Sequence, residues 1–290
     1  MATPNAPLGI ATFNVNGIRA ARRRSFDAWL AGRELDVVAL QELRCPPEQV
    51  GDFDGYHAAM DSGSIPGRNG VAILTRDAPT DVRTWVSHPP RSRGLGAYAG
   101  EGRYLEVDLA DTPLTVACPY LPKGGLPAHL QKPGRMRDAP DGGAAYANKM
   151  RFAAGLSRHL DRSRRAAAAN GREFIVMGDF NVAHRELDVA AWRRSKQAVG
   201  FLPQERAWLE DLLSPRRLVD VVRRLHPDQP GPYTWWSWMG TSYAVDSGWR
   251  IDYHFASPGL ARTATRAWVD REVDGVRMSD HSPVSVDYDF

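Results

Sequence analysis

Short runs of apolar residues, bounded by turn-forming residues, recur along the whole chain and predict β-strands. The predicted strands cover residues 10–15, 37–41, 70–74, 104–109, 114–119, 174–177, 251–256 and 284–288. Apolar residues at helical spacing predict helices over residues 25–32, 149–169, 204–212 and 218–225. The second of these helices stops at Asn170-Gly171, a typical helix end.

The order of these elements is neither a strict alternation of strand and helix nor all strand. It predicts an α/β fold in which two sheets pack face to face and helices cover their outer faces. We find no break in composition, so we expect one domain over residues 1–290. Two stretches rich in Gly, Pro and Arg, residues 88–102 and 123–147, predict long surface loops. Loops of this length are commonly functional or disordered.

Composition narrows the class of protein only moderately. The hydrophobic fraction of 43% allows a real core, and the net charge of +3 permits a polyanionic partner without demanding one. The only two cysteines, Cys45 and Cys118, argue against a disulfide scaffold and favour a reducing compartment. The chain starts without a signal-peptide pattern and contains no apolar run of membrane-spanning length. We therefore expect a soluble cytoplasmic protein without a membrane partner, and the Ala- and Arg-rich composition suggests a bacterial source.

Polar side chains stand where the predicted strands end or begin. They are Asn14, Glu42, Tyr120, Asp179, Asn181, Asp252, Asp280 and His281. Taken one at a time, most have an ordinary explanation, because Asp and Asn are favoured in turns. Taken together, six chain segments that each deliver an acid, an amide, a phenol or an imidazole indicate a shared site.

The oxygen-bearing members of this set suit a hard cation. Glu42 and Asp280, helped by Asn14, offer only oxygen ligands, which Mg²⁺ prefers while it keeps several waters. The chain lacks the Cys and His clusters that a zinc site needs. A magnesium site is therefore the prediction.

The remaining members suit hydrolysis. Asp179 with Asn181 could hold and deprotonate a water molecule, and Asp252 could stabilise the protonated imidazole of His281. A metal, an activated water and an imidazolium together stabilise a crowded anionic transition state. Phosphoester hydrolysis is the reaction that needs all three.

Eleven stretches carry a resemblance to a known family, and they follow its order over nearly the whole chain. They read FNVNGIRA (13–20), LQELRC (40–45), RNGVAIL (68–74), EGRYLEVDL (101–109), PYLPKG (119–124), KMRF (149–152), MGDFNVAH (177–184), FLPQERAWL (201–209), YTWWSW (233–238), GWRIDY (248–253) and SDHSPV (279–284). The chain resembles the exonuclease III family of apurinic/apyrimidinic endonucleases, within the endonuclease/exonuclease/phosphatase superfamily. FLPQERAWL separates it from the superfamily's lipid phosphatases and sphingomyelinases.

The resemblance implies a DNase I-like four-layered α/β sandwich with the active site at one edge of the two sheets. It also implies a Mg²⁺ cofactor, with Mn²⁺ as a substitute ion. The position of Glu42 is the principal metal ligand in the family, and Asn14 and Asp280 lie close to the metal. The remaining residues of the set stand at family positions that act on the attacking water or on the substrate.

In these assignments, Asp179 orients or deprotonates the attacking water and Asn181 supports it. His281, paired with Asp252, contacts the scissile phosphate, and Tyr120 lies beside that phosphate. These family assignments agree with the roles that we argued above from the residue types alone.

The resemblance also implies how duplex DNA binds. The loop that holds Trp235, Met239 and Trp249 forms a pocket wall for a base-free deoxyribose and a wedge into the duplex. Basic residues near the catalytic motifs hold phosphates on either side. They are Arg19, Arg24, Arg44 and Lys123.

The sequence departs from the family at a few positions. Met239 stands where many bacterial members carry arginine, Lys123 replaces a small amide or hydroxyl residue, and Cys118 stands where Asn or Ser is common. Lys123 places an additional positive charge by the phosphate site.

The predicted function is a Mg²⁺-dependent DNA repair nuclease that cleaves 5′ to abasic sites and trims blocked 3′ ends, and that could also degrade duplex DNA from 3′ ends. Its expected partner is double-stranded DNA with such lesions, bound by a monomer in the bacterial nucleoid. Two alternatives stay open. One is a superfamily hydrolase acting on a lipid or inositol phosphate, and the other is a binding protein that has lost catalysis.

Overall fold

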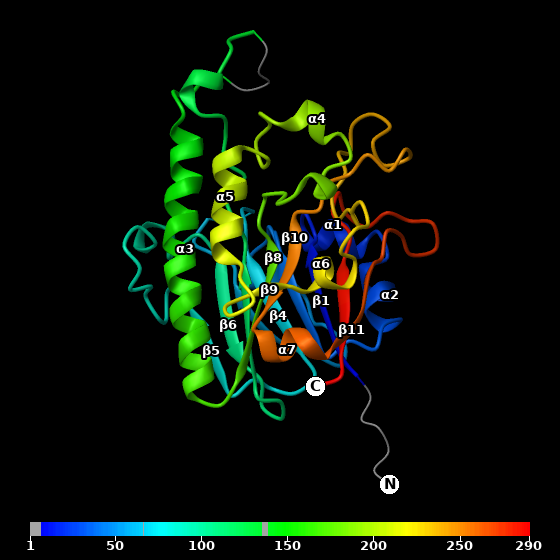
Figure 1. Cartoon of the computed structure of the whole chain (residues 1–290). Helices are drawn as coiled ribbons and strands as arrows, with labels where there is room; N and C mark the ends of the chain where they lie inside the picture. Colours follow the sequence, from blue (N-terminus) through cyan, green and yellow to red (C-terminus); the bar gives the residue numbers. More distant parts are fainter. Residues whose placement is uncertain (1–6, 66, 135–138) are drawn as a thin grey trace.

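Two six-stranded sheets, stacked face to face, form the centre of the computed structural model (Figure 1). The structure describes residues 7–65, 67–134 and 139–290. Sheet A has the strand order β11-β12-β1-β2-β4-β3, and sheet B has the order β5-β6-β7-β8-β10-β9. Each sheet therefore combines strands from distant parts of the chain.

Sheet A is built from both ends of the sequence. Its strands are β1 (Leu8–Asn14), β2 (Val37–Gln41), β3 (His57–Asp61), β4 (Val71–Thr75), β11 (Ala264–Val269) and β12 (Val284–Tyr288). Sheet B comes mostly from the middle of the chain. Its strands are β5 (Asp81–Thr84), β6 (Tyr104–Asp108), β7 (Leu114–Pro119), β8 (Glu173–Asp179), β9 (Val219–Asp220) and β10 (Asp252–Ala256).

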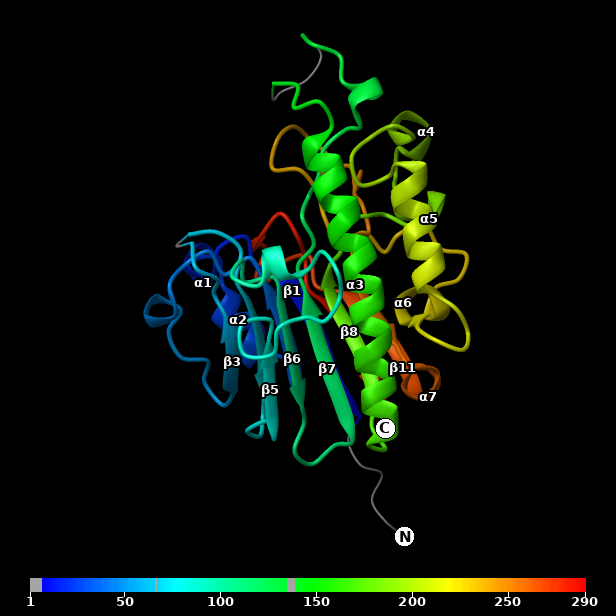
Figure 2. The same cartoon turned by 90° about the vertical axis from the view of Figure 1, so that its left-hand side faces the viewer.

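Helices cover the outer faces of both sheets, which gives four layers (Figure 2). The helices are α1 (Ile18–Arg22), α2 (Phe26–Ala31), α3 (Ala144–Ala169), α4 (Trp192–Ser195), α5 (Pro203–Leu212), α6 (Val221–Leu225) and α7 (Pro258–Thr263). Helices α1 and α2 share a buried cluster with sheet A, whereas α3 and α5 share one with sheet B. Among the described residues, no helix is long and apolar enough to cross a membrane.

The strands alternate their side chains between two cores. Ile10 and Val37 of sheet A meet Val116 and Ile175 of sheet B in the core between the sheets. Their chain neighbours point outward to the helices, as Val176 does in the core beneath α3. Strands buried on both faces in this way read as continuous apolar runs, which is why the sequence predicted them.

Strand direction brings several strand termini to one edge of the sandwich. Strand β1 runs parallel to β2, and β7 runs parallel to β8, so their carboxyl ends lie together. Strands β12 and β10 run antiparallel to β1 and β8, so they begin where their neighbours end. Asp252, at the start of β10, is paired directly with Asp179 at the end of β8.

The predicted two-sheet α/β sandwich is confirmed, and each predicted strand is present within a few residues of its expected bounds. The predicted helix over 218–225 is partly wrong, because its first residues form β9 and the helix starts at Val221. Helix α3 begins at Ala144, five residues before its predicted start, and shortens the predicted loop over 123–147. Residues 135–138 of that loop lie outside the described residues. The single domain stays a prediction.

Candidate active site

A cavity of about 270 Å³ opens at the edge where these strand ends meet. The predicted site residues on its wall are Glu42, Arg44, Tyr120, Lys123, Asp179, Asn181, Trp235, Trp249, Asp280 and His281. Asn14 and Asp252 stand behind them and hydrogen-bond to Asp179 and His281. Segments more than two hundred residues apart in sequence thus supply one site.

Asp179 is the last residue of β8. Its side chain is buried and accepts hydrogen bonds from amide groups. Asn14 Nδ2 donates to its Oδ2 over 2.9 Å, and the backbone N–H of Asn181 donates to its Oδ1 over 2.7 Å. Burial raises the pKa of the Asp179 carboxyl above its usual range; the anions of Asp252 and Glu42 raise it further, while His281 opposes the change. Asp179 is therefore more basic than an ordinary aspartate, as a group that takes a proton from water must be.

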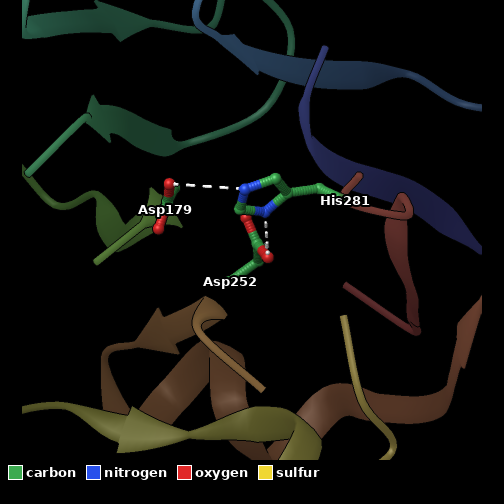
Figure 3. Close-up of side chains that lie close together, drawn as sticks. All are labelled: Asp179, Asp252 and His281. Carbon is green, nitrogen blue, oxygen red and sulfur yellow. Dashed lines mark hydrogen bonds and ion pairs between the residues drawn. The ribbon is translucent and has the colours of Figure 1, made fainter. Parts of the chain in front are cut away.

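His281 lies between two carboxylates (Figure 3). Its Nδ1 is 2.9 Å from Asp252 Oδ2, and its Nε2 is 3.8 Å from Asp179 Oδ2. Thr234 donates its hydroxyl to the same Asp252 oxygen over 2.6 Å and so fixes that carboxylate. Burial lowers the pKa of His281, but the carboxylates of Asp252, Asp179 and Asp280 outweigh it and raise the pKa well above its ordinary value. The imidazole is therefore held as a cation.

Glu42 follows β2 and contacts groups from both sheets. Arg44 lies 2.6 Å from its Oε2, and the hydroxyl of Tyr120 donates to its Oε1. Burial, followed by the charge of Glu42, raises the pKa of Tyr120 well above the ordinary value, so the phenol stays protonated and keeps donating. Because Tyr120 directly follows β7 of sheet B and Glu42 directly follows β2 of sheet A, this contact joins the ends of the two sheets inside the site.

Asp280 accepts hydrogen bonds from several side chains, including those of Asn16 and Trp235. Asn16 Nδ2 donates to its Oδ1 over 2.6 Å, and the indole of Trp235 donates to its Oδ2 over 3.2 Å. Burial raises the pKa of Asp280, but His281 and these donors outweigh it and lower the pKa overall. Asn16, rather than Asn14, is the amide that touches this carboxylate, and the predicted metal role of Asn14 stays a prediction.

Several site residues adopt the left-handed backbone conformation that non-glycine residues rarely use. Their φ angles are 47° at Asn16, 58° at Glu42, 53° at Arg44 and 51° at Asn181. Such conformations persist only where the surroundings determine them, and they cluster at functional sites. Here the turn at Asn16 is held by its own N–H, which donates to Asn14 Oδ1 over 3.0 Å.

The acidic groups of this cavity fit a hard cation. Glu42 and Asp280 offer carboxylate oxygens and Asn16 offers an amide, which is the donor type that Mg²⁺ takes. A second candidate set is Asp179, Asp252 and His281, whose possible ligand atoms all lie within 4.8 Å of one another. The surrounding carboxylates hold His281 as a cation, so the ring would have to lose a proton before either nitrogen could bind a metal.

Comparison with known proteins agrees with this geometry. The sequence model of the Endonuclease/Exonuclease/phosphatase family matches residues 11–281. The chain belongs to this family. An exodeoxyribonuclease from Bacillus subtilis is 27% identical over 280 residues, which cover 96% of this chain and 98% of that protein.

Further similarity extends to eukaryotes and archaea. The DNA repair nuclease APEX1 of Danio rerio is 27% identical over 293 residues, covering 97% of this chain and 82% of that protein. The solved structure of an AP endonuclease from Archaeoglobus fulgidus superposes with a TM-score of 0.79 at 27% identity, covering 98% of this chain and all of that one. The predicted family and its DNase I-like fold are therefore confirmed.

In this member of the family, two tryptophans form the apolar side of the cavity. The rings of Trp235 and Trp249 meet edge to face at 6.4 Å, and Phe201 packs against Trp249. Met239, which was predicted to share this wall, is 69% exposed and does not line the cavity. Its side chain is exposed to solvent outside the cavity.

The predicted arginines are distributed around the cavity rather than gathered in it. Arg44 lines the cavity, while Arg19 lines a neighbouring hollow and donates to Gln49 over 2.8 Å. Arg24 lies 4.9 Å from the ring of Trp238, which is 46% exposed and also carries Arg277 at 4.2 Å. The exposed Trp238 is thus in contact with two cations.

Sequence reasoning missed three residues that support the site from behind. Thr234 fixes Asp252, and a buried ion pair joins Lys149 to Glu205 beneath the Asn181 turn. The KMRF and FLPQERAWL stretches contain this pair, but a lone lysine in a helical pattern normally indicates a solvated face.

Proposed function

We propose that this protein is a Mg²⁺-dependent DNA repair nuclease that hydrolyses the phosphodiester 5′ to abasic sites and trims blocked 3′ ends. The observation that carries the proposal is the convergence of Asp179, His281 and Glu42 in one cavity, although they come from different sheets. The relatives named above, an exodeoxyribonuclease, a DNA repair nuclease and an AP endonuclease, support the choice of DNA over other phosphoesters.

The hydrolytic step is assigned to the acid–base groups. Asp179 takes a proton from the attacking water, which Asn181 holds through its amide, as the water oxygen bonds to phosphorus. The bond between phosphorus and the 3′ oxygen breaks, and that oxygen leaves as a 3′-hydroxyl after taking a proton from solvent. His281, kept protonated by Asp252, donates hydrogen bonds to the phosphate oxygens as negative charge develops on them. The Asn14 amide donates a hydrogen bond to Asp179 and so fixes the orientation of this carboxylate.

Mg²⁺ is assigned to the oxygen donors on the other side of the cavity. Glu42 and Asp280 would hold the ion, with Asn14 or Asn16 nearby, and Mn²⁺ would serve as a substitute. A bound divalent ion would supply charge stabilisation for the phosphate oxygens. The Arg44 guanidinium, 2.6 Å from Glu42, balances the same negative charge that the ion would balance.

The apolar wall supports the preference for a base-free sugar. Trp235 and Trp249 give the cavity an apolar wall against which a base-free deoxyribose would pack. Lys123 and Arg44, on the rim, and Arg19 and Arg24, farther out, would hold phosphates of the two strands. Met239 would insert into the duplex as a wedge.

The test uses a duplex with one tetrahydrofuran abasic analogue, incubated with Mg²⁺, with Mn²⁺ or with EDTA. We expect a single cut 5′ to the analogue, in a metal-dependent reaction that EDTA abolishes. A duplex with a 3′-phosphate tests end trimming in parallel. Tight binding without any cut would indicate a protein that has lost catalysis, and turnover of a phosphoinositide with inert DNA would indicate a lipid phosphatase.

A further inference from the structure

A lysine is buried beneath the cavity although no step proposed above uses it. Lys149 lies in the first turns of α3 and its side chain is 1% exposed. Its Nζ lies 2.8 Å from the backbone oxygen of Asn181 and 2.5 Å from Glu205 Oε1, and it donates to both. Burying an ammonium group is costly unless it is paired and hydrogen-bonded, so this placement requires both partners.

The partner carboxylate is equally buried and equally occupied. Glu205, in the first turn of α5, is fully buried, and its Oε2 accepts the N–H groups of Gly200 over 2.7 Å and Leu202 over 3.0 Å. Gly200 lines the cavity, and its carbonyl accepts the N–H of Ala183 over 2.8 Å. Glu205 therefore ties the start of α5 to one wall of the cavity.

Close packing links the same lysine to a third segment of the wall. A Cβ added to Gly124 would lie 2.5 Å from Lys149 Cδ, so the backbone beside Lys123 rests on the lysine stem. A Cβ added to Gly200 would lie 3.0 Å from the Asn181 oxygen that Lys149 binds. One ion pair thus contacts three segments of the cavity wall, namely Lys123–Gly124, Asn181 and Gly200.

We propose that Lys149 and Glu205 are positioning residues, which set the places of Asn181, Gly200 and Lys123 around the reacting phosphate. The inference rests on the proposed nuclease function. Asn181 needs such a device because its left-handed backbone, at a φ of 51°, must be imposed by its surroundings.

Stability alone does not explain an ion pair at this depth. Replacing a buried ion pair by apolar residues of similar size is often neutral or stabilising. What an apolar pair cannot do is donate to Asn181 and accept from Gly200. Burial lowers the pKa of Lys149, and Glu205 opposes the change, so the ammonium depends on its partner.

The deciding variant is the double substitution Lys149→Met with Glu205→Met, which removes both charges together and leaves neither one unpaired. We expect kcat on the abasic duplex to fall roughly 100-fold, because a displacement of about 1 Å at a reacting centre costs this much. KM should rise less than the tenfold expected for loss of Lys123 itself, because the double variant keeps every phosphate-binding cation and removes only the support beneath Lys123. A matched control is Leu160→Ala, in a fully buried position about 16 Å farther along α3.

Leu160→Ala should lower the melting temperature and leave kcat unchanged, which separates loss of packing from loss of positioning. If the double variant does not fold, Glu205→Gln takes its place, and it should lower kcat about tenfold at constant KM because it still offers one acceptor oxygen. A folded double variant, or a Glu205→Gln protein, with the kcat of the original protein would overturn the proposal.

Amide hydrogen exchange makes the inference independent of catalysis. Segments 179–183 and 198–202 should exchange faster in the double variant than in the original protein or in Leu160→Ala. If the original protein does not cut the abasic duplex, the proposed function fails while this measurement still judges the ion pair. Equal exchange in all three proteins would refute the positioning role.

Discussion

Two buried histidines show how differently the edge and the interior of this sandwich treat a charge. His254 lies in β10 between the sheets, with Nε2 3.1 Å from the carbonyl oxygen of Val284 and Nδ1 3.3 Å from the hydroxyl of Tyr288. Burial lowers its pKa to about 4, so it is neutral at pH 7. His281, at the edge, is buried to a similar depth but keeps its proton, because carboxylates surround it.

The difference teaches that depth does not decide the charge state. Asp252 and His254 are two residues apart on the same strand, yet the first stabilises a cation and the second is itself kept neutral. Neighbouring carboxylates outweigh the cost of burial at His281. At His254 the hydrogen bond to Val284 and the charge of Asp220 raise the pKa too little to offset burial.

The largest expected effect comes from removing a carboxylate at the edge. Asp179→Asn should lower kcat by about 10³-fold or more, because it removes the proposed base and one anion beside His281. Single-turnover cleavage of the abasic duplex measures the change, and fluorescence anisotropy in EDTA should show nearly unaltered DNA binding. A defect confined to KM would contradict the role assigned to Asp179.

The interior histidine should act on stability rather than on rate. Its folded-state pKa of about 4 lies below the unfolded value of 6.5, so the unfolded chain binds more protons between these values. Its contribution is therefore complete above pH 6.5 and decreases as the pH falls towards 4, by up to about 3 kcal/mol. Urea denaturation across this range measures the decrease.

The control for this titration is His254→Gln, which should flatten the decrease with pH while the cleavage rate at pH 7.5 stays near that of the original protein. An unchanged slope would assign the titration to another group, such as His159, whose pKa burial also lowers to about 4.

A charge at the rim should matter less than the charges around His281. Lys123→Met should raise KM about tenfold with little change in kcat and should reduce the salt dependence of binding by about one ion. The measurement is KM and affinity over a series of salt concentrations. Lys196→Met, an exposed cation that lies outside the cavity lining, is the matched control. Equal losses in both variants would indicate general attraction to DNA rather than a contact in the cavity.

The smallest effect is expected from the exposed loop tip. Met239→Ala should weaken binding to the abasic duplex only about two- to threefold, because the side chain lies outside the cavity and gains contacts only with DNA. Competition with undamaged duplex measures it. If Met239→Ala keeps the original preference for damaged DNA, Met239 does not act as the wedge.

The central strands were readable from sequence because they are buried on both faces. The runs at 37–41, 114–119 and 284–288 have the same bounds in the structure. Strands β3 and β5 escaped prediction because they are edge strands with partly exposed side chains, so neither shows an apolar run or a clear alternation.

The same limit applies to the site. Residues that follow apolar runs, such as Asp179 and Glu42, were identifiable because polar groups at strand ends stand out. Lys149 and Glu205 were not, since each lies within a helical pattern where a charge normally faces water. Only packing reveals that both point inward, and the choice between Asn14 and Asn16 at Asp280 likewise required coordinates.

The contacts that cross between the sheets have a consequence for when this protein can act. Glu42 and His281 come from the sheet A side, whereas Tyr120, Asp179 and Asp252 come from the sheet B side. Neither half carries a complete set of acid, base and charged groups by itself. On the proposed function, a partly folded or nicked chain in which the halves have not docked would not cleave DNA, so activity would require the finished tertiary structure.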